Sequence, residues 1–88
     1  MSVFAGGSAY NMVRDVADGY VIVNERTFKS FGVKEFNEFA QEVNRFLQEV
    51  RSDQPGLDDT GAIQKRQRRM QRLQQALTIA NGARHRRG

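Results

Sequence analysis

The chain of 88 residues contains no cysteine, and it has only one histidine and one proline. Without thiols there can be no disulfide, no thiolate nucleophile and no cysteine-bound zinc, and this absence fits a reducing cytoplasm. The single histidine, His85, has no second imidazole with which to share a metal ion. The sequence therefore predicts no metal site and no cofactor.

Long apolar runs and catalytic motifs are also missing. No stretch approaches the ~20 apolar residues needed to cross a bilayer, and residues 1–7 are too short and too uncharged for a secretory signal. The chain has no glycine-rich phosphate loop and no nucleophile elbow. We expect a soluble protein that is not an enzyme, that lies in the cytoplasm during its synthesis and that makes no membrane contact.

Acidic residues are missing from the last part of the chain. Residues 1–59 hold six Lys or Arg against ten Asp or Glu, whereas residues 60–88 hold eight Lys or Arg and no acid. The formal net charge of +4 therefore hides a separation of charge along the sequence. A chain this short is marginally stable alone, so we expect protein partners, namely copies of itself and a larger assembly.

The clearest structural pattern lies in residues 31–51. Apolar side chains recur there at helical spacing, within an arc of roughly 140°. They are Phe36, Phe39, Ala40, Val43, Phe46, Leu47 and Val50. Gly32 is the expected N-cap, with Glu35 at the third helical position and Phe31 packed on Phe36 as a hydrophobic staple. This segment predicts an amphipathic helix that lies on a core.

Two smaller elements precede this helix. Residues 8–18 predict a short helix, with Ser8 as its N-cap and Gly19 as the left-handed residue that ends it. Residues 20–31 contain two β-prone runs around a polar turn, and they predict a small β-hairpin packed on the long helix. An extended loop that leads directly into the helix is the alternative.

A break at Pro55 and Gly56 ends the long helix and leads into a second one. Asp58 and Asp59 stand where this second helix favours negative charge, and Gly82 should end it. The predicted fold class is α+β, mostly helical, with a short helix, a small β-hairpin, a long amphipathic helix and a second long basic helix. The expected parts are a flexible arm at 1–7, a compact helix–hairpin–helix core at 8–52, a linker at 53–59, a basic amphipathic helix at 60–82 and a basic tail at 83–88.

The second helix and the tail carry the positive charge. The cations are Lys65, Arg68, Arg69 and Arg72, within about 100° on one side of the helix, and Arg84, Arg86 and Arg87 in the tail. A row of cations without neighbouring acids predicts contact with phosphates or with an acidic protein surface, and a solvated helix face is the alternative. No aromatic residue follows Phe46, so a nucleic acid would be held by its backbone rather than by stacked bases.

Arg66 projects from the apolar side of the second helix, between Ile63 and Met70. A buried guanidinium without a partner costs several kcal/mol. Either the first turn of the apolar stripe is exposed, or Arg66 meets a carboxylate on another surface. The second alternative adds Arg66 to the predicted partner contacts.

Two further surfaces suggest assembly. The acidic row on the long helix, opposite its core side, consists of Glu35, Glu38, Glu42 and Glu49. This row is complementary to the basic row of a neighbouring subunit, and solubility alone is the alternative. The thin apolar seam of the second helix consists of Ile63, Met70, Leu73 and Leu77, and it offers a surface through which two copies would join.

The order of the elements resembles the small head–tail joining proteins of tailed bacteriophages. These elements are the short helix, the hairpin at 20–31, the longer helix VKEFNEFAQEVNRFLQEV and an arginine-rich C-terminus. The resemblance covers about residues 8–51 and implies a compact α+β subunit in a ring beneath the portal, close to the exit path of packaged DNA. The departures are a very short hairpin turn and an extra long helix after Pro55.

We therefore expect a structural protein, most concretely a phage head–tail connector or head-completion subunit located in the virion. It would oligomerise and contact a portal-like neighbour or the DNA backbone. One alternative is a small nucleic-acid-binding regulator that dimerises through the apolar seam. Another is a phage-type inhibitor that binds one host protein through its charged faces.

Overall fold

The structure is a computed structural model that describes all residues except 1–2, 53–55, 57 and 88. Its elements in chain order are helix α1 (Ala9–Asp18), the 3-10 helix η1 (Glu25–Phe28), helix α2 (Val33–Ser52) and helix α3 (Thr60–Arg87). The described residues contain no β-strand. Parts of the predicted arm at 1–7 and most of the predicted linker at 53–59 lie outside the described residues.

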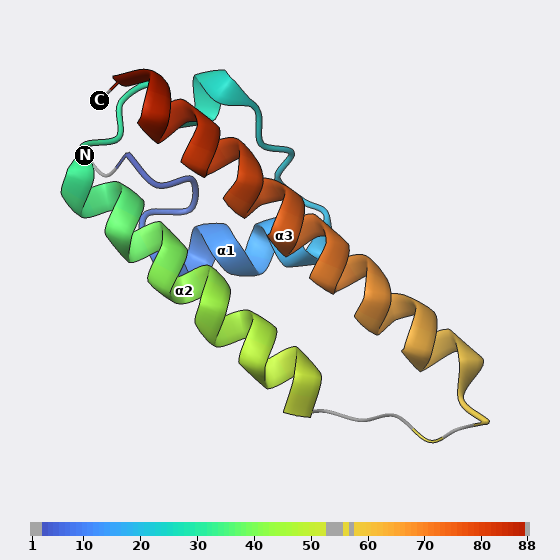
Figure 1. Ribbon diagram of the computed structural model, residues 1–88. Helices are drawn as coiled ribbons and strands as arrows, with labels where there is room; N and C mark the ends of the chain where they lie inside the picture. The colour runs from blue at the N-terminus through green and yellow to red at the C-terminus, as the bar shows by residue number, and fades with distance from the viewer. Residues whose placement is uncertain (1–2, 53–55, 57, 88) are drawn as a thin grey trace.

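The two long helices, α2 and α3, run antiparallel and side by side, and α1 lies across the pair (Figure 1). Each of these three helices contacts the other two, and η1 contacts α3. The body is elongated, with extents of 45 × 24 × 19 Å. The start of α2, the 3-10 helix η1 and the end of α3 lie at one end of the body, and the end of α2 and the start of α3 lie at the other (Figure 1).

The predicted ends of α1 are confirmed. The hydroxyl oxygen of Ser8 accepts a hydrogen bond from the N–H of Asn11 at 3.1 Å, as expected of an N-cap. Gly19 has the left-handed φ of 86°, and its N–H donates to the carbonyl of Val16 at 3.2 Å. Both ends are therefore fixed by residues next to them in sequence.

The predicted start of α2 is confirmed as well. The N–H of Gly32 donates to Oε1 of Glu35 at 2.8 Å, and the rings of Phe31 and Phe36 lie 5.3 Å apart between centroids. At the start of α3, Oδ1 of Asp59 accepts from the N–H of Ala62 at 3.1 Å. The negative charge predicted for that position thus caps the helix directly.

The predicted α+β fold is wrong, because residues 20–31 form no β-hairpin and the described residues are all helical or irregular. The N–H of Tyr20 donates to the carbonyl of Asp15 at 2.8 Å, so it completes the end of α1 instead of a strand ladder. Asn24 and Thr27 then bond to each other in a capping box that starts η1. The observed connection is closer to the alternative of an extended loop.

Helix α3 is longer than predicted. It runs past Gly82 to Arg87, so the predicted helix end at residue 82 and the separate tail at 83–88 are wrong. Glycine inside a helix costs about 1 kcal/mol relative to alanine. The burial of Ala80 and Ala83, which are 3% and 8% exposed, offsets this cost on either side of Gly82.

An aromatic cluster forms the centre of the core. Phe28 and Phe39 are fully buried, with their ring centroids 5.2 Å apart. The ring of Phe4 meets Phe31 at its edge, at 5.2 Å between centroids. Phe4 and Ala5 of the predicted arm thus pack on the core of their own subunit.

Helix α3 enters this core mainly through small side chains. Its buried residues are Leu73, Ala76, Ala80 and Ala83. Small residues at a contact let two helices approach closely, because the distance between helix axes depends on the side chains between them. Met70 and Leu77, which the sequence pattern favoured, are only partly buried at the edge of the cluster.

Replacement of Gly19 by alanine should cost more stability than the same change at Gly7. Both glycines have a positive φ, 86° and 93°, in which an L-residue loses about 1–2 kcal/mol. A Cβ on Gly19 would also lie 3.0 Å from the guanidinium carbon of Arg72, whereas one on Gly7 would meet nothing within 4 Å. We expect Gly19→Ala to lower the free energy of unfolding in urea by about 1 kcal/mol more than Gly7→Ala. Equal losses would mean that Arg72 is not held against Gly19.

Candidate phosphate-contact surface

Arg66 closes the end of α2. Its Nε donates to the carbonyl of Val50 at 2.9 Å, and its Nη2 donates to the carbonyl of Arg51 at 3.4 Å. The last carbonyls of a helix have no partner within it and carry the negative end of its dipole. A guanidinium at this end therefore donates the missing hydrogen bonds and is also attracted by the dipole. The sequence predicted either that Arg66 is exposed or that it meets a carboxylate on another surface. Neither describes it, because its partner is the backbone of α2.

Arg69 and Arg72 contact the end of α1. Nη1 of Arg72 donates to the carbonyl of Ala17 at 3.1 Å. Arg69 donates to Oδ1 of Asp18 from Nη2 at 2.6 Å and from Nε at 3.2 Å. Because these side chains are 39% and 27% exposed, the ion pair is only partly screened by water. Much of the row that was predicted to meet a partner therefore joins α3 to its own subunit.

Two arginines near the end of α3 also have partners, but at the surface. Nη1 of Arg84 donates to Oδ1 of Asn37 in α2 at 3.2 Å. Arg86 forms an ion pair with Glu25 of η1, in which the two side chains are 70% and 60% exposed. Such exposed pairs contribute little stability, typically about 0–1 kcal/mol. The side chain of Arg87 lies outside what the structure describes.

Several cations have a charged side-chain group that makes no hydrogen bond or ion pair with any described residue. They are Arg26, Lys29, Lys34, Arg51, Lys65 and Arg68, and all are exposed. About 28 Å of helix separates Lys65 from Arg84. The predicted basic row and the predicted tail therefore do not form one strip, and the unpaired cations lie at both ends of the body.

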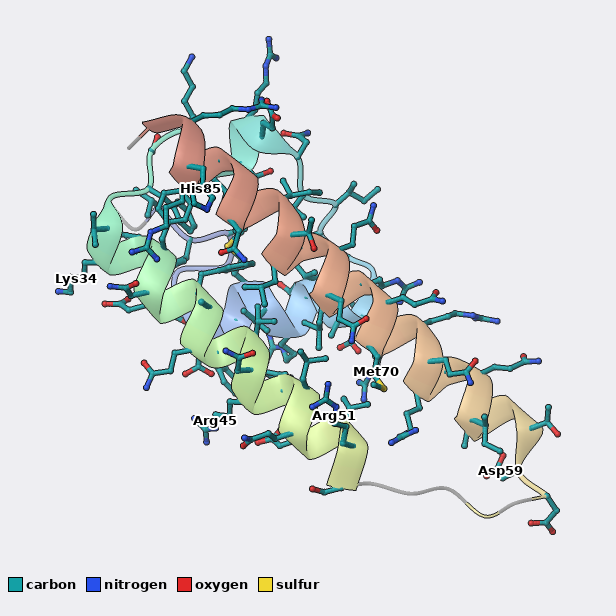
Figure 2. All side chains as sticks on the ribbon, in the orientation of Figure 1. Lys34, Arg45, Arg51, Asp59, Met70 and His85 are labelled. Atoms are coloured by element: carbon teal, nitrogen blue, oxygen red, sulfur yellow. The ribbon has the colours of Figure 1, made fainter. Side chains whose placement is uncertain are left out.

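One end of the body collects the larger group, which we call the basic end. It consists of Arg26, Lys29, Lys34, Arg84, His85 and Arg86. Arg26, Lys29 and Arg86 line one shallow groove, and Arg84 and His85 line another with the start of α2. Lys34 and His85 are labelled at this end in Figure 2.

The basic end exists because Phe28 anchors η1. This ring is buried in the core, and η1 contacts α3, so Arg26 and Lys29 on either side of it stand next to Arg86. Sequence reasoning placed both cations in a hairpin and did not count them as contacts. The signal that would have found them is the capping residue Asn24, followed by two cations that lie three residues from each other, as on one helical turn.

The other predicted surfaces are partly used within the subunit. In the acidic row, Glu35 caps its own helix, and Glu42 and Glu49 lie 3.8 Å and 3.7 Å from Arg45, while Glu38 is half-buried. In the apolar seam, Leu73 is fully buried, Met70 and Leu77 pack against the core, and Ile63 is half-buried. Leu73 thus has no exposed surface to offer to a second copy.

The described residues contain no group of three or more His, Asp or Glu side chains that could hold a metal ion. Within the same residues, no helix combines the length and the apolar character that crossing a membrane requires. No protein-family model, curated protein or solved structure matches the chain. The functional argument therefore depends on the charges and contacts described above.

Arg66 and Arg68 provide a matched test of the division between structural and unpaired cations. Both lie on α3, but Arg66 bonds to the end of α2 whereas Arg68 has no partner among the described residues. We expect Arg66→Met to lower the free energy of unfolding by about 1–2 kcal/mol and Arg68→Met to change it by less than about 0.5 kcal/mol. Urea unfolding followed by circular dichroism measures both. Similar values for the two variants would contradict the capping role of Arg66.

Proposed function

We propose that this chain is a non-enzymatic assembly protein that contacts the phosphate backbone of DNA through its basic end. The observation that carries the proposal is the position of Arg26 and Lys29, whose charged groups have no partner among the described residues and stand beside Arg86. Cations from separate elements that converge on one surface raise the local positive potential, and such a surface attracts a polyanion.

The contacts that already exist at the basic end are easily exchanged. Arg86 is paired with Glu25 at the surface, so replacing that carboxylate with a phosphate costs about 1 kcal/mol or less. Arg84 bonds only to the neutral amide of Asn37. A phosphate would give both guanidinium groups a stronger, charge-assisted partner.

The surface is suited to the DNA backbone rather than to the bases. The aromatic ring of η1, that of Phe28, is fully buried and cannot stack on a base. Arg and Lys contacts to phosphate fix the position of a duplex but carry no sequence information. The proposed binding is therefore independent of sequence and strongly dependent on salt.

The concrete form of this proposal is a subunit of the head–tail joining complex of a tailed bacteriophage, located in the virion, with copies of itself and a portal-like neighbour as protein partners. The support is the resemblance noted in the sequence, of which the order of α1 and α2 and the arginine-rich end of α3 remain. The hairpin is no part of this support, since the described residues lack it.

A double variant, Arg26→Gln with Lys29→Gln, should bind duplex DNA more weakly than the wild type. Each lost phosphate contact lowers the slope of log K against log salt by about 0.9, so two lost contacts should lower its magnitude by about 1.8. Fluorescence anisotropy with a labelled duplex of mixed sequence, at several salt concentrations, measures the affinity and the slope.

The matched control is Arg14→Gln with Arg45→Gln. It removes the same formal charge, but from residues that lie 3.6 Å from Asp15 and 3.7 Å from Glu49 on their own helices. We expect this control to keep the wild-type slope. The proposal fails if the wild type does not bind DNA at low salt, or if the two double variants lose affinity equally.

A further inference from the structure

The outer face of the second half of α3 carries polar side chains without charge. Exposed residues lie there within an arc of roughly 120°, at about 100° per residue along the helix. They form what we call the amide face and are Gln71, Gln74, Gln75, Thr78, Asn81 and His85. The exposed face of a helix commonly carries charged side chains, whereas no Lys, Arg, Asp or Glu stands in this arc.

Most hydrogen-bonding groups of this face are unused within the subunit. The side-chain amides of Gln71, Gln74, Gln75 and Asn81 make no hydrogen bond with any described residue. Each amide group holds donors and an acceptor side by side. Thr78 differs, because its hydroxyl donates to the backbone carbonyl of Gln74 at 3.0 Å. The amides therefore remain available to a partner outside the subunit.

Cations stand on both sides of the amide face where it reaches the basic end. On one side Arg84 lies against α2, through its bond to Asn37. On the other side Arg86 lies against η1, next to Arg26 and Lys29. Figure 1 shows this end of α3 between the start of α2 and η1. The surface thus presents a neutral strip of amides between two positive margins.

The acids nearby do not interrupt this pattern. Glu25 is paired with Arg86, and Oε1 of Glu35 accepts from the N–H of Gly32. Residues 60–88 hold no acid at all. A polyanion that meets both margins therefore finds no carboxylate of α3 between them.

The major groove of a DNA duplex has the complementary arrangement, because its base edges lie between two phosphate strands. We infer that the end of α3 enters this groove, with the amide face against base edges and the two margins against the phosphates of the two strands. The inference rests on the proposed DNA contact and adds recognition of bases to it. A helix of about 10–12 Å diameter fits a groove about 12 Å wide. The deep and narrow major groove of duplex RNA does not admit side chains, so RNA is not the occupant.

The amides of this face favour adenine. A Gln or Asn side chain donates to N7 of adenine and accepts from its N6 amino group at the same time. Gln74 and Asn81 lie two turns apart on the same side of the helix, a distance of about 10 Å. This length corresponds to about three base-pair steps of roughly 3.4 Å, so both amides reach the same short stretch of sequence. The Arg and Lys contacts hold the duplex without reading it, so the preference depends on the amides.

Gly82 lies in the same arc. A Cβ at this position would meet nothing within 4 Å, so no contact within the described subunit requires the missing side chain. Glycine lowers helix stability, and it is favoured where a backbone comes close to a ligand. Its place on this face allows α3 to approach the base edges closely.

A selection followed by a substitution tests the inference. From duplexes with a random central segment, the wild-type chain should enrich sequences that contain adenines within a few base pairs of one another. Fluorescence anisotropy should show that it binds the selected duplex at least about 10-fold more tightly than a mixed-sequence duplex at the same salt concentration, since one bidentate amide–adenine pair discriminates by roughly 5–150-fold. Gln74→Ala with Asn81→Ala should weaken binding to the selected duplex about 10-fold. Binding to the mixed duplex and the salt slope should not change, because the amides carry no charge.

The matched control is Gln41→Ala with Gln48→Ala, which removes two exposed amides from α2. This control should keep the wild-type preference, and circular dichroism checks that the helices are intact in both double variants. If the wild type binds no duplex at low salt, the proposed DNA contact fails and this inference fails with it. If the wild type binds all duplexes equally, or if the variant of Gln74 and Asn81 keeps the preference, the inference alone is overturned and the backbone contact stands.

A modified base tests the groove and the atoms directly. Replacement of adenine by 7-deazaadenine in the selected duplex exchanges the N7 acceptor for a C–H group and leaves Watson–Crick pairing and the minor groove unaltered. The wild type should lose about 10-fold in affinity, whereas the variant of Gln74 and Asn81 should bind the modified and unmodified duplexes equally. An unchanged affinity of the wild type would place the amides away from the adenine edges and overturn the inference.

Discussion

The fold depends on guanidinium groups of α3 that meet the carboxyl ends of α1 and α2. A helix of three turns such as α1 is not stable alone, and the terminal carbonyls of both helices need partners. Arg66 supplies them for α2, and Arg72 supplies one for α1 while Arg69 holds Asp18. One helix thereby fixes the ends of two others, and the Phe28 cluster and the small alanines of α3 fill the space between them.

This use of charge changes what the composition means for function. Residues 60–88 hold eight cations and no acid, but those that bond to helix ends are not available to a partner at the same time. The charge that is left lies at the two ends of the body, and the larger group includes Arg26 and Lys29 from the acidic part of the sequence. A surface built from both parts of the chain is what we propose to meet DNA.

Capping residues and their neighbours are the features that the sequence predicted correctly. Ser8, Gly19, Gly32 and Asp59 act within four residues of themselves, so their partners are visible in the sequence. The partner of Arg66 is sixteen residues away in the sequence, and no local pattern points to it. The hairpin failed because alternation in residues 20–24 reveals a strand-like face but not whether a partner strand exists. The buried Ala76 and Ala83 escaped notice because periodicity favours large apolar residues, whereas closely packed helices favour small ones.

The central claim is that the arginines of α3 are divided between the fold and a partner. The most direct test is the NMR spectrum of the arginine Nε–H groups, recorded with and without a DNA duplex. The account predicts slow exchange with water and no change on DNA addition for Arg66 and Arg69, whose Nε atoms donate to Val50 and Asp18. It predicts shifted signals for Arg26 and Arg86. Fast exchange at Arg66 and Arg69, or shifts there as large as those at the basic end, would contradict it.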